Sequence, residues 1–398
     1  MPFVLYVLAS AVLAQATSEF MLAGLVAEIA RDLDVPVAAA GSLTSAFAVG
    51  MVVGAPLMAL SARRLPPRTA LSGFLAVFLA VHVLGALTPG FGVLMATRVV
   101  AALANAGFLA VAFALVLRVV PPERTARATA TLLAGTTLAL IVGVPAGAML
   151  GQLLGWRSTF WAVALVSLPV LAGVLVTVPG HADGRGPAPA VRQELRALRR
   201  APVVLTLLVG ALVNGGTFAV YTYLAPLLTG AGGLGAEAVP VGLALFGIGS
   251  FAGVTLAGRL ADAHHRSLLL VGGTIVLLGW VALALPAGHG RVTLLLVAMM
   301  GAAAFAVGSA VIARSLTLAS GAPTLGGSAT TAALNVGATA GPLVGGWSLS
   351  MSATGPAWAA AGLTALAAVP AVAASWSGGR RPGVRTPPSG GRRTGPDL

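Results

Sequence analysis

A glutamate and an arginine lie inside long apolar runs of the sequence, where charged side chains are rare. Glu19 lies in the run 3–27, and Arg98 lies in the run 92–117. An ionised group in hydrocarbon costs on the order of 3 to 10 kcal/mol or more, so each group needs a partner or a wet cavity. Glu19 is therefore a candidate proton carrier, with Arg98 tuning it as water access changes. The simpler alternatives are a structural ion pair or, for Arg98, hydrogen bonds that tie its helix to backbone carbonyls.

Uncharged polar residues accompany this pair. Gln15 precedes Glu19 by one helical turn, and Asn105 follows Arg98 by two turns, so each helix presents its polar residues on one face. We expect the two faces to meet in one cavity. Polar groups without charge recur in the runs 202–229 and 327–350, at Asn214, Tyr221, Tyr223 and Asn335. Such groups suit a neutral amphipathic ligand, with hydrogen bonds between helices as the alternative.

The sequence contains no residues whose types and spacing indicate another kind of site. Cysteine and lysine are absent, which excludes disulfides, thiolate nucleophiles and a phosphate loop with its lysine. His82 and His289 are isolated in the sequence, and His264 and His265 lie in a predicted loop, so we expect solvated or interfacial roles for them. The sequence predicts no catalytic residues, no metal site and no cofactor.

The composition determines the class of protein. Of the 398 residues, 58% are hydrophobic and 8% are charged, against about 25% charged in soluble domains. A membrane-spanning helix needs about 20 apolar residues. Twelve apolar runs meet this need, at about 3–27, 39–61, 70–88, 92–117, 128–151, 157–178, 202–229, 238–260, 267–286, 291–313, 327–350 and 354–376. The sequence predicts an all-α polytopic membrane protein with twelve transmembrane helices.

The distribution of charge predicts the orientation. Almost all of the net charge of +13 lies in alternate connections, in the central linker and in the tail, and the other connections are nearly neutral in sum. Because positive residues are retained on the cytoplasmic side, we expect both termini in the cytoplasm and the chain in the inner (plasma) membrane. The high pI then reflects basic residues that set the orientation in the membrane and does not indicate binding to nucleic acid. We therefore expect no nucleic-acid partner.

The chain divides into two similar halves. Three pairs of similar residues are separated by about 198 residues each, and this offset indicates two parallel six-helix halves. The pairs are Gln15 and Asn214, Gly54 and Gly253, and Pro145 and Pro342. We predict an N-terminal half at 1–178, a basic cytoplasmic linker at 179–201, a C-terminal half at 202–377 and a disordered basic tail at 378–398. Repeats of this kind build a midplane cavity that opens alternately to each side.

Two glycine-containing motifs are candidates for conformational roles. The run 128–151 contains Gly143, Pro145 and Gly147, and the corresponding run 327–350 contains Pro342. Small residues let helices approach closely, and an interior proline bends a helix. The second motif, Gly258-Arg259-Leu260-Ala261-Asp262, lies between two predicted spans.

These motifs resemble those of the major facilitator superfamily, and specifically its twelve-span drug:proton antiporters, over about residues 3–376. GVPAG at 143–147 looks like the antiporter motif of span five, and Arg98 with Asn105 looks like the span-four arginine motif linked to proton transfer. The motif at 258–262 resembles the loop that clasps the cytoplasmic gate. Longer segments resemble chloramphenicol-efflux exporters, at 17–25, 43–59, 102–112 and 143–161.

The resemblance implies proton-coupled efflux of a neutral amphipathic drug, with chloramphenicol or a related phenicol as the leading substrate. Export of a sugar or a nucleoside by the same mechanism is the alternative, and a non-transporting membrane receptor or enzyme is a remote one. We expect a monomer whose partners are protons, the lipid bilayer and a small-molecule substrate.

Overall fold

The structure is a computed structural model that describes residues 2–61, 66–180, 191–285, 290–322 and 325–377, and every regular element in these ranges is helical. In chain order the elements are α1 (Phe3–Phe20), α2 (Leu22–Asp32), α3 (Val37–Ser61), α4 (Pro67–Leu87), α5 (Phe91–Val119), η2 (Pro122–Arg124), α6 (Thr125–Leu138), η3 (Ala139–Gly143), α7 (Val144–Leu154), α8 (Arg157–Thr177), α9 (Val191–Leu198), α10 (Ala201–Tyr221), α11 (Leu224–Pro226), η4 (Leu227–Ala231), α12 (Ala238–Ala284), α13 (Gly290–Leu318), α14 (Leu325–Leu349) and α15 (Gly355–Ser377).

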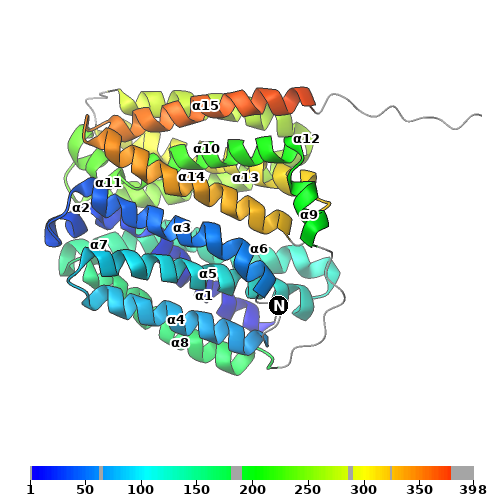
Figure 1. Cartoon of the computed structure of the whole chain (residues 1–398). Coiled ribbons are helices and arrows are strands. Elements are labelled where there is room, and N and C mark those ends of the chain that lie inside the picture. Colours follow the sequence, from blue (N-terminus) through cyan, green and yellow to red (C-terminus); the bar gives the residue numbers. More distant parts are fainter. Residues whose placement is uncertain (1, 62–65, 181–190, 286–289, 323–324, 378–398) are drawn as a thin grey trace, which may run out of the picture.

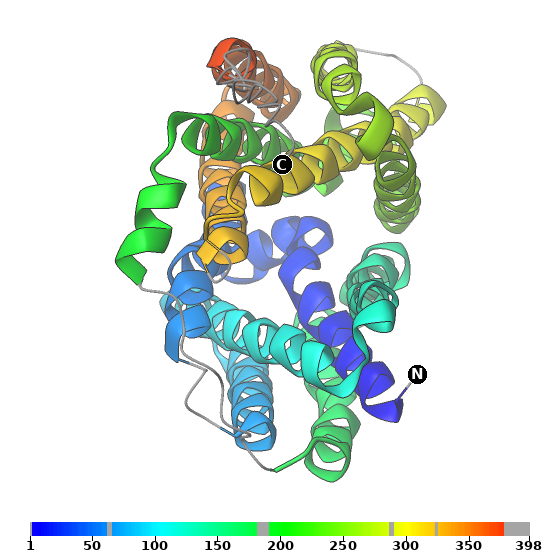
Figure 2. The ribbon, with the colours of Figure 1, turned by 90° about the vertical axis from the view of Figure 1, so that its right-hand side faces the viewer.

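The long helices run side by side and form two groups, one made of α1 to α8 and the other of α10 to α15 (Figure 1). The same two groups are separate in the view turned by 90° (Figure 2). Helix α9 lies at one end of the bundle, which we call the linker end, and α2, α7 and α11 lie at the opposite end, which we call the far end (Figure 1).

Each predicted span corresponds to helix. Ten helical segments of the described ranges are long and apolar enough to cross a membrane, and a shorter apolar helix covers Gly355–Ala371. The remaining span is α14, which has 25 residues and is richer in glycine, serine and threonine. The predicted all-α architecture of twelve transmembrane helices is therefore confirmed, while the boundaries of the two halves stay a prediction.

Three details differ from the expected pattern. The first span is interrupted at Met21, where the Gly24 amide bonds to the Met21 carbonyl three residues back and tightens the turn. The fifth span contains a π-helical turn, η3, which ends at Gly143. The predicted loop at 261–266 has helical backbone and lies within α12. The tail at 378–398 and residues 181–190 of the linker lie outside the described residues.

Helix α12 contains two predicted spans, 238–260 and 267–286. Its 47 residues would measure about 70 Å if straight, more than twice the thickness of a hydrocarbon core. The contacts with α13 show that the chain turns back. Gly249 and Gly253 lie against Ala298 and Ala302 in parallel order. Gly272 and Gly279 lie against Val307 and Met300 in antiparallel order. The chain therefore reverses direction between Gly253 and Gly272.

The outer surface of the bundle is apolar, as a lipid environment requires. Large aliphatic side chains stand exposed on several helices, including Leu165, Val176, Leu256 and Leu295. In contrast, Arg98 is among the largest fully buried side chains. Hydrocarbon covers the apolar exterior, whereas polar groups in the interior must find partners within the protein or in a wet cavity.

Candidate functional site

Arg98 is buried inside the first group of helices. It lies on α5 with an exposed fraction of 1%. Its Nη1 donates to the Ser18 hydroxyl at 2.8 Å, and its Nη2 donates to the Ser18 backbone carbonyl at 2.6 Å. The guanidinium carbon also lies 4.8 Å from the ring centre of Phe47 and 5.9 Å from that of Phe160. Hydrogen bonds and aromatic faces thus stabilise the buried charge.

The hydrogen-bond network extends from Ser18 to His82 on α4. The Ser18 Oγ lies 2.6 Å from Nε2 of His82, and Nδ1 of His82 lies 2.6 Å from the Phe78 carbonyl oxygen. His82 is 1% exposed. The expectation of a solvated or interfacial role for His82 is therefore wrong, because its ring packs between Phe78 and Phe160 in the interior.

Glu19 follows Ser18 and lies at the edge of this network. Its side chain is half-buried and interacts electrostatically with Arg98 and with Tyr221. In the part of the chain that the structure describes, Glu19 and Arg98 form no ion pair, because the guanidinium is bonded to Ser18 instead. The structural ion pair considered from the sequence is therefore not formed in this conformation, although the two groups lie close enough to interact electrostatically.

Gln15 and Tyr221 have buried side chains whose polar atoms bond to none of the residues that the structure describes. Gln15 is 1% exposed, and neither its amide oxygen nor its amide nitrogen bonds to any described residue. The Tyr221 hydroxyl is equally unpartnered in a side chain that is 4% exposed. Leaving a buried polar atom unpaired costs about 1 to 3 kcal/mol, so these atoms are suited to a water molecule or a bound ligand.

An aromatic cluster surrounds Tyr221 and joins the two groups of helices. Phe20 of α1 stacks on Phe218 of α10 at 5.9 Å between ring centres, and its edge meets Tyr221 at 6.0 Å. Tyr221 also packs against Phe246 of α12 at 4.8 Å, and Phe246 meets Phe305 of α13 at 6.0 Å. Together these five rings, at 20, 218, 221, 246 and 305, form what we call the aromatic cluster. It lies beside Glu19 and offers flat apolar faces.

The three asparagines predicted to bind substrate have protein partners. Asn105 of α5 is 2% exposed, and its Nδ2 points at the Met51 sulfur at 3.8 Å. Asn214 of α10 donates to the Leu334 carbonyl of α14 at 2.8 Å. Asn335 donates to the Thr331 carbonyl of its own helix at 2.9 Å. In this conformation these three side-chain amides contact other groups of the protein, and their role in binding substrate stays a prediction.

Tyr223 lies where the two groups of helices meet at the far end. Its hydroxyl donates to the Pro342 carbonyl of α14 at 2.8 Å and lies 3.4 Å from the Ala38 carbonyl of α3. Gly41 and Gly346 face the Tyr223 ring from α3 and α14, and any side chain at either position would collide with it. We call these residues, with Ala38, the far-end seam. Deeper in the bundle, the Ser45 hydroxyl donates to the Thr339 carbonyl at 2.8 Å, again from α3 to α14.

The predicted motif of the fifth span lies against the first span. Gly143 ends the π-helical turn η3 and faces Thr17 of α1, which leaves no room for a side chain at this position. Pro145 is buried at the start of α7. The Gly147 carbonyl accepts a hydrogen bond from the Thr159 hydroxyl of α8 at 2.8 Å. π-Helical turns often mark functional positions, and this one packs on Thr17, two residues before Glu19 in α1.

The second predicted motif lies within α12. Gly258 and Arg259 are exposed, and no atom stands close to the position of a Gly258 side chain. The Asp262 side chain lies outside the described residues. The structure therefore does not bring this motif near the network around Arg98.

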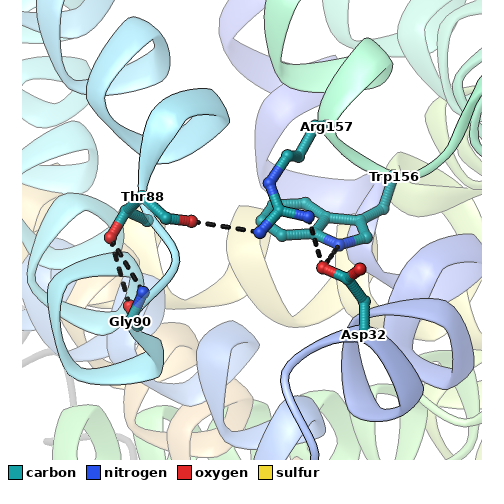
Figure 3. Close-up of polar contacts among 5 residues, drawn as sticks. All are labelled: Asp32, Thr88, Gly90, Trp156 and Arg157. Carbon is teal, nitrogen blue, oxygen red and sulfur yellow. Dashed lines mark hydrogen bonds and ion pairs between the residues drawn. The ribbon is translucent and has the colours of Figure 1, made fainter.

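A polar cluster closes the far end of the first group of helices (Figure 3). The indole Nε1 of Trp156 donates to Asp32 Oδ2 at 3.0 Å, and Arg157 forms an ion pair with the same carboxylate. Arg157 also donates to the Thr88 carbonyl at 3.2 Å. The hydrogen bonds from Trp156 and Arg157 hold the pKa of Asp32 below its ordinary value. This cluster ties the connections after α2, α4 and α7 together.

Sequence reasoning missed Ser18, His82 and the phenylalanines of the aromatic cluster. His82 carried the same signal as Glu19 and Arg98, since it is an ionisable residue within the apolar run 70–88. The phenylalanines carried no such signal, because aromatic side chains are expected throughout a membrane bundle. Among the described residues, no group of three or more histidine, aspartate or glutamate side chains could hold a metal ion.

The helical bundle, its apolar exterior and its buried polar interior are those of an integral membrane protein. Residues 8–331 match the Major Facilitator Superfamily, and the chain belongs to this family. Membership indicates transport rather than catalysis.

Relatives of known sequence agree with this family. The chain is 54% identical over 371 residues to a chloramphenicol resistance protein of Streptomyces lividans, covering 92% of this chain and 95% of that protein. It is 37% identical over 332 residues to the inner membrane transport protein YdhP of Escherichia coli K12, covering 83% and 84%.

Solved structures share the fold. A bacterial homolog of the human lysosomal transporter Spinster matches in its inward-facing, occupied conformation with a TM-score of 0.75 and 17% identity, covering 97% of this chain and 98% of that one. The inward-facing, unoccupied conformation gives a TM-score of 0.71 with 18% identity and 94% coverage of both chains.

Proposed function

We propose that this transporter exports chloramphenicol or a related phenicol in exchange for protons. The observation that carries the proposal is the 54% identity, over nearly the full length of both chains, to a chloramphenicol resistance protein. Resistance follows when a transporter of this family removes the drug from the cell. The inner membrane with both termini in the cytoplasm, as the charge pattern predicts, is the location that this function requires.

The aromatic cluster and its polar neighbours support a phenicol as substrate. A phenicol has one aromatic ring, two hydroxyls and an amide, and it carries no charge. The rings at 20, 218, 221 and 246 offer faces for stacking, and the unpartnered atoms of Gln15 and Tyr221 offer hydrogen bonds to hydroxyl and amide groups. A neutral ligand also needs no counter-ion, which leaves Glu19 free for another task.

Glu19 is the residue that we assign to the proton. It is half-buried beside the aromatic cluster, and it is not consumed by an ion pair with Arg98. A carboxylate in this position can take a proton when water reaches it and hold that proton when water is excluded. Arg98 supplies a fixed positive charge that favours release of the proton.

The contacts between the two groups of helices support alternation between two states. The far-end seam and the hydrogen bond from Ser45 to Thr339 join α3 to α14. Gln152 of α7 donates to the Ala236 carbonyl at 2.8 Å, also across the two groups. Rocking of one half against the other would part these contacts and open the far end while the linker end closes.

Drug susceptibility tests this proposal most directly. Cells that express the gene should tolerate more chloramphenicol and other phenicols than cells with an empty vector, and their tolerance of unrelated drugs should change little. Export of a sugar or a nucleoside is the second outcome. Unchanged phenicol tolerance, together with increased efflux of a labelled pentose or nucleoside, would overturn the phenicol assignment and establish that alternative.

A further inference from the structure

Ser18 joins Arg98 to His82, a buried side chain that the proposed proton exchange does not itself use. The chain of contacts runs from Arg98 on α5 through the Ser18 hydroxyl on α1 to His82 on α4, with distances of 2.8 Å and 2.6 Å between the polar atoms. All three residues have exposed fractions of 1% or less. Because three helices meet in one hydrogen-bonded chain, its members fix one another's positions.

The Phe78 carbonyl determines the direction of these hydrogen bonds. A carbonyl oxygen can only accept, so Nδ1 of His82 must carry the hydrogen in the 2.6 Å contact with Phe78. A neutral His82 then presents Nε2 as an acceptor, and the Ser18 hydroxyl donates to it. The lone pairs of the Ser18 oxygen are thereby left for Arg98, whose Nη1 can only donate. A second positive charge at His82, beside buried Arg98, would be costly.

The arrangement also prevents movement of the arginine. The Ser18 backbone carbonyl accepts from Nη2 at 2.6 Å, and the rings of Phe47 and Phe160 lie near the guanidinium carbon. His82 packs on Phe160 as well, with 5.8 Å between ring centres. The Arg98 charge is therefore held by the residue next to Glu19 and not by Glu19 itself.

We propose that Ser18 and His82 are positioning residues that keep the Arg98 charge at a constant place beside Glu19. This inference rests on the proposed proton exchange at Glu19. The titratable groups that face Glu19 among the described residues are Arg98 on α5 and Tyr221 on α10, and His82 acts on it through Ser18. Ser18 also prevents α1 from rotating about its own axis, so it sets the direction in which the Glu19 side chain points.

The test compares proton exchange in reconstituted vesicles as pH is varied. Ser18→Ala removes the hydroxyl, and His82→Phe removes the acceptor while keeping a ring against Phe78 and Phe160. Both should move the midpoint of the pH profile of drug-driven proton release by about half a unit or more, with the KM for the drug unchanged. His82→Gln keeps an acceptor at this position, because its side-chain oxygen can accept from the Ser18 hydroxyl. Unlike His82→Phe, it should therefore show the wild-type pH profile.

A matched control separates positioning from a general loss of stability. Ser167→Ala removes another fully buried serine hydroxyl, which among the described residues bonds only to the Val163 carbonyl within α8, so its pH profile should match that of the wild type. Wild-type profiles for both Ser18→Ala and His82→Phe would overturn the positioning role alone. A wild-type protein that releases no proton on binding the drug would instead overturn the proposed exchange, and the inference with it.

A measurement on the wild-type protein covers the case in which Ser18→Ala fails to reach the membrane. In protein labelled with 15N-histidine, the His82 signals are identified as those that His82→Gln removes. We expect a protonated Nδ1 and a hydrogen-bonded, unprotonated Nε2. The opposite tautomer would exclude donation from Ser18 to His82 and overturn the inference.

Discussion

Arg98 makes two hydrogen bonds to Ser18, one to its hydroxyl and one to its backbone carbonyl, and Glu19 is the next residue along α1. A buried arginine close to a buried glutamate suggests an ion pair, and here the guanidinium takes a neutral partner from the same helical turn. The carboxylate and the cation therefore influence each other through space without being bonded. Such an arrangement permits the carboxylate to change its protonation without breaking a structural contact.

Glu19→Gln should separate drug binding from proton coupling. Glutamine keeps the shape of a protonated glutamate but cannot exchange a proton. The variant should bind the drug with an affinity close to that of the wild type, yet it should fail to accumulate drug against its gradient when a pH difference is imposed. Linkage also requires that drug binding release a proton from the wild type near neutral pH and none from the variant.

The matched control for this prediction is Glu123→Gln, which makes the same change at an exposed position in η2. It should transport as the wild type does. Gradient-driven efflux by Glu19→Gln at the wild-type rate would mean that the proton travels through another group.

Arg98→Ala should abolish proton-driven export while protein remains in the membrane. The substitution removes the charge that acts on Glu19 and both hydrogen bonds to Ser18. Arg98→Lys should restore little, because a lysine ammonium cannot present two parallel donors in the fixed geometry of a guanidinium. Transport in vesicles, normalised to the amount of folded protein, measures the effect. Wild-type export by Arg98→Ala would reduce the arginine to a structural role.

Tyr221→Phe should weaken drug binding by about 2- to 10-fold, the expected effect of losing one neutral hydrogen bond to the ligand. The ring remains in the aromatic cluster, so folding should be unaffected. Tyr6→Phe is the control, since Tyr6 is 53% exposed on α1. Equilibrium binding of a phenicol measures both variants. Equal affinity of Tyr221→Phe and the wild type for the phenicol would mean that the Tyr221 hydroxyl does not bind the drug.

The cluster around Asp32 predicts a small loss of stability in acid. Because Trp156 and Arg157 lower the pKa of Asp32 in the folded protein, their stabilising effect is complete above the ordinary pKa of an aspartate. It is lost as the pH falls through the lower, folded value. The effect should be below about 1 kcal/mol, since the ion pair is partly exposed to solvent, which screens it.

Thermal unfolding in detergent, between neutral pH and about pH 3, checks this prediction. Wild-type protein should lose slightly more stability over this range than Asp32→Asn, which cannot titrate. An equal loss in both proteins would mean that Asp32 is not held ionised by its neighbours.

The charge pattern predicts that α15 ends on the cytoplasmic side. A reporter fused after Ser377, the last residue of that helix, should be active only if it requires the cytoplasm. Activity of a periplasmic reporter at the same position would contradict both the orientation and an even number of spans.

Composition and span length predicted the architecture well, because a membrane helix must satisfy its own backbone and needs a long apolar run. The same logic located Glu19 and Arg98. It failed at His82, which is as buried as Arg98 and obeys the same rule. The error came from treating histidine as a metal ligand or a solvated base, and not as a neutral hydrogen-bonding group in the interior.

Side-chain partners were less predictable than helices. Asn214, Asn335 and Tyr223 were expected to face a ligand, and each donates a hydrogen bond to a backbone carbonyl in this conformation. Nothing in the sequence states which carbonyl lies within reach, because that depends on how distant helices are turned relative to one another. Tyr221 was expected at the site, but the four phenylalanines that pack around it were missed for the same reason, since the five rings of the aromatic cluster come from four helices.

The far-end seam has one further property. Of the two carbonyls near the Tyr223 hydroxyl, the nearer belongs to Pro342 in its own group of helices, so parting the two groups costs this hydroxyl its 3.4 Å contact with Ala38 and leaves its shorter bond intact. The seam is therefore held by the fit of glycine against a ring and not by strong bonds. A single methyl group at Gly41, which faces the Tyr223 ring from the other group of helices, would act as a wedge, favouring the separated form as a ligand of that form would. Substitutions at this seam could therefore shift the equilibrium between the two conformations without changing any residue that binds the drug or carries the proton.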